Sequence, residues 1–160
     1  MLNIIKPRQS DLEQIKTILC QWTEPAEVEK YLLRFTNEIN GQTEYGMQFW
    51  IAEDNGVVMG VVGLSDPMPN LLTFAQTKNP GEIKILYVDG QSQGKGIGKE
   101  LINFIQMEAA KKRYSELLVR SAQKYKLTAY GFYEKLGYTN LGAVGSESKQ
   151  MQVFGKVIAG

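Results

Sequence analysis

A short glycine-rich segment, QGKGIG, has the residue types and the position needed to bind an anion. It covers Gln93–Gly98, directly after an apolar run and directly before a helical pattern. The first N–H groups of a helix have no acceptor within the helix, and the helix dipole adds partial positive charge there. Glycines lack the Cβ atoms that would keep a phosphate away from these amides. The segment therefore predicts a binding site for a phosphate or diphosphate group.

Two common phosphate-binding motifs do not fit this segment. A P-loop needs four residues between its glycines, followed by Lys and a hydroxyl residue. Here three residues separate Gly90 from Gly94, and Gly96 stands where the hydroxyl residue belongs. A dinucleotide fingerprint needs a third glycine, where this chain has Lys99, and an acidic residue at the end of the next strand, which is absent. Nucleotide binding of either kind is disfavoured.

The composition restricts the chemistry further, because the 160 residues include one Cys and no His. Without His, neither a Ser-His-Asp triad nor an HExxH zinc site can be built. Cys20 alone cannot form an internal disulfide or a Cys-rich metal site. We therefore expect no metal, and any proton transfer must use Glu, Asp, Tyr, Lys or water.

Bulk properties predict one domain over residues 1–160, because domains cluster at about 100–150 residues. The sequence has neither a signal-peptide pattern at its start nor an apolar run long enough to span a membrane. Together with the single Cys, this predicts a cytoplasmic location and no membrane partner. A formal net charge of +1 argues against a nucleic-acid partner.

Hydrophobic periodicity predicts the element order β-α-α-β-β-β-α-β-α-β-β, which is typical of a mixed α/β domain. A capping box, Ser10 to Glu13, starts the first helix, and Asn55-Gly56 predicts a tight hairpin turn. The expected strands are 3–6, 48–53, 57–64, 82–88, 116–121, 138–141 and 150–158. Three further helices are expected. One begins near residue 25, and the other two cover 98–112 and 127–136. The long segment 65–81 is a candidate active-site flap.

Two segments together resemble the GNAT superfamily of N-acetyltransferases. EIKILYVDGQSQGKGIGKELI (Glu82–Ile102) is similar to its acetyl-CoA motif, with Gln93, Gly96 and Gly98 satisfying Q/R-x-x-G-x-G. AYGFYEKLGY (Ala129–Tyr138) resembles its second signature, one strand further on. The resemblance implies a single-domain GNAT-like fold. Its central sheet would be mixed but mostly antiparallel, with six to seven strands splayed at the centre and helices on both faces.

The resemblance also implies acetyl-CoA as co-substrate and assigns residues to it. Amides of the glycine loop would hold the diphosphate, and backbone groups of Leu86 and Val88 would bind pantetheine like an added strand. Lys126 replaces an Asn that often contacts pantetheine, so it is assigned to the 3′-phosphate or to solvent. The implied cofactor residues are Leu86, Tyr87, Val88, Gln93, Gly94, Lys95, Gly96, Ile97, Gly98, Lys99 and Lys126.

For catalysis, the resemblance implies that a primary amine attacks acetyl-CoA directly, without an acetyl-enzyme. Tyr133 matches the tyrosine that acts as general acid to the CoA thiolate, with Tyr130 as a nearby competitor. Glu82 resembles a glutamate that serves as base in some members. Another carboxylate, such as Glu53, or a water chain remains an alternative.

The amine acceptor is open between a small amine, an amino acid, an antibiotic and a protein N-terminus. Residues 1–80 carry 6 basic and 10 acidic side chains, whereas residues 81–160 carry 12 and 7. An acidic first half favours a cationic amine, and a basic second half favours the anionic cofactor. The resemblance places the acceptor near 21–28, 41–50, 66–81 and 143–148. Homodimers are common in the family. The alternative function is a non-catalytic acyl-CoA-binding or partner-binding module on the same fold.

Overall fold

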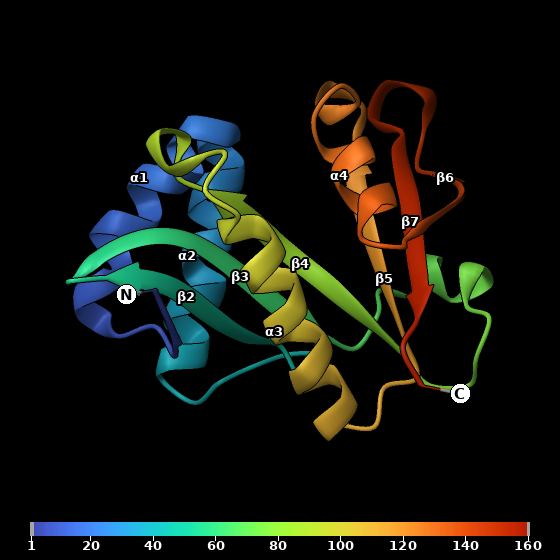
Figure 1. Cartoon of the computed structure of the whole chain (residues 1–160), viewed down its shortest axis with the longest axis horizontal. Helices are drawn as coiled ribbons and strands as arrows, with labels where there is room; N and C mark the ends of the chain where they lie inside the picture. Colours follow the sequence, from blue (N-terminus) through green and yellow to red (C-terminus); the bar gives the residue numbers. More distant parts are fainter. Residues whose placement is uncertain (1, 160) are drawn as a thin grey trace. The chain divides into compact units, whose positions relative to one another are not determined.

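The computed structural model describes residues 2–159, which form two compact units (Figure 1). The first unit contains the chain as far as Leu64, together with Ile85–Ile105. The second contains Ser65–Lys84 and the residues from Gln106 onward. Each unit is therefore built from segments that are far apart in the sequence. The prediction of one domain over residues 1–160 stays a prediction.

The strands form one seven-stranded sheet with the order β1-β2-β3-β4-β5-β7-β6. β4 pairs with β5 in parallel, whereas the pairs β1–β2, β2–β3, β5–β7 and β6–β7 are antiparallel. The predicted mixed sheet is confirmed. Its strands are β1 (Asn3–Ile5), β2 (Gln48–Asp54), β3 (Val57–Ser65), β4 (Pro80–Val88), β5 (Glu116–Ala122), β6 (Thr139–Val144) and β7 (Met151–Val157).

The helices follow the predicted order, with shifts at their ends. They are α1 (Leu12–Trp22), α2 (Pro25–Ile39), α3 (Ile97–Lys111) and α4 (Ala129–Lys135). The predicted capping box between Ser10 and Glu13 is wrong, because α1 begins after Asp11. The Asp11 carboxylate instead accepts the Arg8 backbone N–H at 2.8 Å and its Nε–H at 2.9 Å. The Arg8 side chain therefore takes the carboxylate that could have capped the helix.

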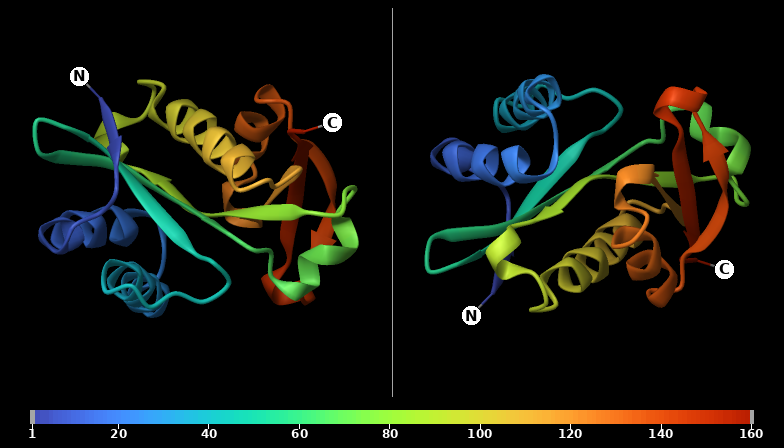
Figure 2. Two further views of the ribbon diagram at one scale, coloured as in Figure 1. Left: turned by 90° about the horizontal axis from the view of Figure 1, so that it is seen from below. Right: turned by 90° about the horizontal axis from the view of Figure 1, so that it is seen from above.

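In the first unit, helices cover both faces of the strands, with α1 and α2 on one side and the Ile97–Ile105 part of α3 on the other (Figure 2). Alternation along β2 explains this layering. Phe49 is fully buried and stacks on Phe35 of α2, with ring centroids 4.1 Å apart. The next residue, Trp50, points to the other face and meets Phe104 of α3 edge-on. The expected hairpin turn is confirmed, with φ of 51° at Asn55 and 81° at the glycine that follows.

In the second unit, β5 and β7 carry different partners on their two faces. Phe154 of β7 contacts the ring of Tyr133 of α4, with centroids 5.5 Å apart. The neighbouring residue, Val153, belongs instead to a core cluster with Leu118 of β5 and Leu71. Leu71 lies in a short 3-10 helix, Pro69–Phe74. This 3-10 helix and α4 therefore cover opposite faces of the same strands.

Two buried carboxylates anchor the connection between β3 and β4. Glu116, 1% exposed, accepts the backbone N–H groups of Gln76 and Thr77 at 2.8 and 2.7 Å. Glu82, also 1% exposed, accepts the N–H of Met68 at 2.9 Å. The segment expected as a flap is thus tied at both ends to the strands beneath it.

We expect Glu116→Ala to lower the free energy of unfolding by about 3 kcal/mol, because the alanine leaves two N–H groups without their charged acceptor. Denaturant unfolding measures this loss. Glu134→Ala is the matched control, since Glu134 is exposed on α4 of the same unit, and it should change stability by less than about 0.5 kcal/mol. Equal losses in both variants would contradict the anchoring role of Glu116.

None of the helices within residues 2–159 combines the length and the apolar character that crossing a membrane requires.

Candidate functional site

The second half of β4 carries the predicted pantetheine-binding residues. Registered pairs between β4 and β5 run from Pro80–Glu116 to Ile83–Val119. Ile85 follows with φ of 52°, in the left-handed region that a β-branched residue rarely adopts. Such a backbone resembles the extra residue of a β-bulge, which bends its strand and ends local pairing. The sequence holds no signal for it, because Ile has no preference for this conformation.

Val88, at the end of β4, has a carbonyl oxygen that already accepts two hydrogen bonds. One comes from Trp22 Nε1 at 2.8 Å and the other from Gln93 Nε2 at 3.2 Å. A carbonyl oxygen has two lone pairs, so both are used. The predicted contact of Val88 with pantetheine is thereby limited to its N–H group.

The glycine loop leads directly into α3 through two glycines with left-handed backbone. Gly94 and Gly96 have φ of 79° and 78°, which disfavours any side chain there. The N–H of Glu100 donates to the Gly96 carbonyl at 3.0 Å, and this is the first-turn bond of α3. The amides from Ile97 to Lys99 precede that bond and belong to the first turn, whose N–H groups have no acceptor within the helix.

The predicted lysines differ in their placement. Lys95 and Lys99 are exposed, in the loop and in the first turn of α3. Lys126 is exposed in the second unit, where its N–H donates to the Gln123 carbonyl at 3.0 Å just before α4. Apart from Lys126, the predicted cofactor residues all belong to the first unit.

Tyr133 lies on α4 with its side chain buried among aromatic rings. It is 6% exposed and contacts Phe132, Tyr138 and Phe154, with ring centroids 5.3–6.0 Å apart. Burial raises the pKa of the Tyr133 phenol above its ordinary value. The phenol therefore keeps its proton at neutral pH, as a proton donor must.

Glu82 stands in a buried cluster with two cations. Its Oε2 accepts the Nε–H of Arg120 at 3.1 Å, and Lys84 Nζ lies 3.6 Å from its Oε1. The register aligns Glu82 with Leu118, on the face covered by the 3-10 helix, whereas Tyr133 packs on the opposite face. Glu82 and Tyr133 thus lie on opposite faces of the strands of the second unit.

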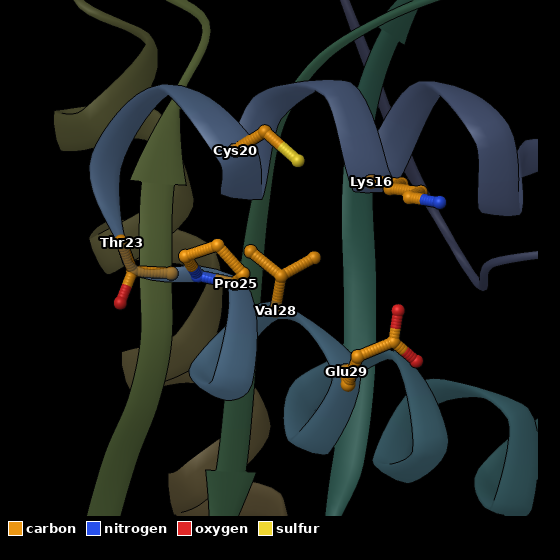
Figure 3. Close-up of a pocket in the computed structure, with 6 residues that line it drawn as sticks. All are labelled: Lys16, Cys20, Thr23, Pro25, Val28 and Glu29. Carbon is orange, nitrogen blue, oxygen red and sulfur yellow. The ribbon is translucent and has the colours of Figure 1, made fainter.

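A cavity of about 190 Å³ opens between α1 and α2 in the first unit (Figure 3). The thiol of Cys20 points into it from α1, opposite Val28 of α2. Its lining residues are Lys16, Cys20, Thr23, Pro25, Val28 and Glu29. Three of these, Thr23, Pro25 and Val28, fall in the segment expected near the acceptor, and none is a predicted cofactor residue.

Sequence reasoning missed Arg120 altogether. It placed Gln21 and Trp22 in the segment 21–28 expected near the acceptor, but it missed their contacts with Gly90 and Val88. Arg120 reaches Glu82 through the parallel register of β4 and β5, 38 positions apart. Trp22 reaches Val88 across 66 positions. Such contacts depend on packing between distant segments, and no local pattern in the sequence indicates them.

Comparison with known families decides the assignment of the fold. A family model described as an acetyltransferase (GNAT) domain matches residues 20–149. The chain belongs to the GNAT family of acetyltransferases. This match confirms the family membership that the two sequence motifs implied. The predicted enzyme class, a GNAT-type N-acetyltransferase, is also confirmed.

Curated relatives of the GNAT domain are longer proteins. Human N-acetyltransferase 8B is 31% identical over 103 residues, which cover 62% of this chain and 42% of the relative. The N-acetylaspartate synthetase of Xenopus tropicalis is 26% identical over 122 residues, which cover 76% and 38%. The chain spans about two fifths of the length of these relatives.

Solved structures confirm the GNAT fold over almost the whole chain. A protein of Desulfovibrio desulfuricans assigned to the GNAT family has a TM-score of 0.84 at 14% identity, covering 99% of this chain and 100% of its own. An aminoglycoside 6′-N-acetyltransferase solved with coenzyme A has a TM-score of 0.71 at 17% identity, covering 99% and 98%. The predicted mixed α/β GNAT-like fold is therefore correct.

Proposed function

We propose that this GNAT domain transfers an acetyl group from acetyl-CoA to a primary amine. The observation that carries the proposal is the glycine loop at the start of α3, where two glycines with left-handed backbone precede amides that have no acceptor within the helix. The coenzyme A bound by the structurally similar aminoglycoside acetyltransferase supports it. In this proposal the residues Gln93–Lys99 bind the diphosphate, and Leu86 and the Val88 N–H bind the pantetheine arm.

In the proposed reaction, the lone pair of the neutral amine attacks the thioester carbonyl carbon. The new C–N bond forms as the C–S bond breaks, and the CoA sulfur takes the leaving electron pair. Tyr133 donates its phenolic proton to that sulfur, and the amine nitrogen gives up a proton to a base. Burial supports the role of Tyr133, since it keeps the phenol protonated before the sulfur arrives.

Glu82 is the proposed base, acting through a water molecule. Both of its oxygens already accept protein N–H groups, from Met68 and Arg120. Each carboxylate oxygen has a second lone pair, so a bridging water can still donate to it. Its place on the face opposite Tyr133 supports separate paths for the two protons. Another carboxylate, or water alone, remains the alternative base.

We expect Glu82→Gln to lower kcat/KM for the amine about tenfold at pH 7, because an amide cannot take the proton. The deficit should shrink as the pH approaches about 10, where the amine loses its proton to solvent. The pH profile of kcat/KM measures this, and denaturant unfolding reports any loss of the anchor to Met68. A less stable variant with the wild-type pH profile would leave Glu82 as an anchor only.

Thiol release from acetyl-CoA with a panel of amines tests the proposed function. The panel should include aspartate and an aminoglycoside, because names of similar proteins contain these acceptors, as well as polyamines and peptide N-termini. Turnover with at least one amine is the expected result. Binding of acetyl-CoA without turnover across the panel would favour the non-catalytic module instead.

A further inference from the structure

The last two residues of α1 reach the point where β4 leads into the glycine loop. Trp22 Nε1 donates to the Val88 carbonyl at 2.8 Å. Gln21 makes two bonds: its Nε2 donates to Asp89 Oδ1 at 2.8 Å, and its Oε1 accepts the Gly90 N–H at 2.8 Å. Three consecutive residues of the chain are thus held by two consecutive residues of one helix.

The segment that these bonds hold has little stiffness of its own. Residues 89–98 contain four glycines and no proline, so no ring fixes a φ angle and four of the ten positions lack the restriction that a Cβ atom imposes. Other bonds complete the arrangement: the Asp89 N–H donates to Met59, and Ser92 donates its N–H to Asp89 O, both at 2.8 Å. The side-chain bonds from α1 tie the start of this segment to a helix that precedes it in the sequence.

We propose that Gln21 and Trp22 are positioning residues that hold the glycine loop ready for acetyl-CoA. The inference rests on the proposed function, since it assumes that the loop binds the cofactor. If the loop adopts its binding conformation in only a fraction of the molecules, the apparent dissociation constant of the cofactor equals the intrinsic one divided by that fraction. Fixing Val88, Asp89 and Gly90 in advance keeps that fraction high.

Gln21 also binds the negatively charged side chain of Asp89. The Asp89 carboxylate lies four residues before Gln93, and a diphosphate nearby would be repelled by it. Gln21 Nε2 bonds one carboxylate oxygen, and the Ser92 hydroxyl lies 3.4 Å from the other. These donors fix the direction of the carboxylate. Gln21 therefore affects both the backbone and the electrostatics at the start of the loop.

Gln14 provides a matched control on the same helix. Its Nε2 donates to the Gly56 carbonyl at 3.1 Å, and its Oε1 accepts the Val58 N–H at 2.9 Å. Like Gln21, Gln14 thus donates one side-chain bond and accepts one, but both of its partners are backbone groups at the β2–β3 turn. Gln14→Ala should therefore lower the thermal midpoint without affecting the start of the glycine loop.

The experiment measures the dissociation constant of coenzyme A by calorimetry for the wild type, Gln21→Ala, Trp22→Phe and Gln14→Ala. We expect about a fivefold rise for Gln21→Ala and for Trp22→Phe, and no change for Gln14→Ala. A change below about twofold in Gln21→Ala would overturn the inference. An equal rise in Gln14→Ala would also overturn it, as general destabilisation. A wild type that does not bind coenzyme A would instead refute the proposed function.

Discussion

Replacing Tyr133 with phenylalanine is expected to lower kcat about a hundredfold and to leave the dissociation constant of coenzyme A almost unchanged. The phenol hydroxyl is the only group lost, and general acids of this kind contribute about 10²-fold or more. The ring itself packs among Tyr138 and Phe154, and phenylalanine preserves those contacts. Steady-state kinetics with a responsive amine, together with calorimetry of coenzyme A binding, measures both quantities.

Tyr130→Phe is the matched control for Tyr133→Phe. Tyr130 lies on the same helix, and its hydroxyl is buried without a hydrogen-bond partner among residues 2–159. Removing that hydroxyl should leave kcat unchanged and should not lower stability, because no bond is lost. If Tyr130→Phe reduced kcat and Tyr133→Phe did not, the acid assignment would move to Tyr130.

The pH dependence of the same pair of enzymes provides a second check. Burial raises the pKa of Tyr133, so the folded enzyme keeps the phenol protonated where a free tyrosine begins to ionise, near pH 10. The ratio of wild-type to Tyr133→Phe kcat should therefore stay constant between about pH 6 and about pH 10. A ratio that falls within this range would mean that the phenol loses its proton there.

Replacing Gly96 with valine is expected to weaken coenzyme A binding at least about a hundredfold. Gly96 has φ of 78°, which a β-branched side chain adopts only at a cost of about 1–2 kcal/mol. Its neighbourhood is open, because a Cβ there would meet no other atom within 4 Å. The harm to binding therefore comes from altered backbone and from a side chain beside the amides, and not from a clash within the protein.

Gly41→Val separates backbone strain from loss of the cofactor site. Gly41 has φ of 77° and lies in the turn after α2, and a Cβ added to it would, as at Gly96, meet nothing within 4 Å. Both variants should lose similar stability in thermal unfolding, and Gly41→Val should bind coenzyme A like the wild type. Normal binding by Gly96→Val would argue against the phosphate role of the loop.

Local patterns in the sequence predicted most of the fold. Alternation gave β2 and β3 within a residue or two, and Asn55-Gly56 gave the turn between them, because these signals depend on neighbours along the chain. The predicted start of α1 was wrong, and the reason is physical. Asp11, one residue beyond the expected cap, is bound to the Arg8 side chain, an interaction that the capping pattern does not include.

The candidate site could be predicted only where its chemistry lies in one segment. The glycine loop and the motif around Tyr133 are continuous in sequence, so their residue types are visible at once. The left-handed Ile85 could not be predicted, since tertiary structure imposes it against the preference of its side chain. The partners of Glu82 and Val88 come from β5 and α1, and only the folded chain brings them together.

The interleaving of the two units has a consequence for synthesis and for expression of fragments. The first unit needs Ile85–Ile105, and the second needs Ser65–Lys84, so each unit is interrupted by residues of the other. During translation, the N-terminal strands cannot complete their unit until α3 has left the ribosome, and Ser65–Lys84 must wait for still later residues. A cut between Lys84 and Ile85 leaves both units incomplete, because the N-terminal piece lacks Ile85–Ile105 and the C-terminal piece lacks Ser65–Lys84. Neither of these two pieces of the chain is therefore expected to fold on its own, whereas co-expressed pieces have a route to complementation.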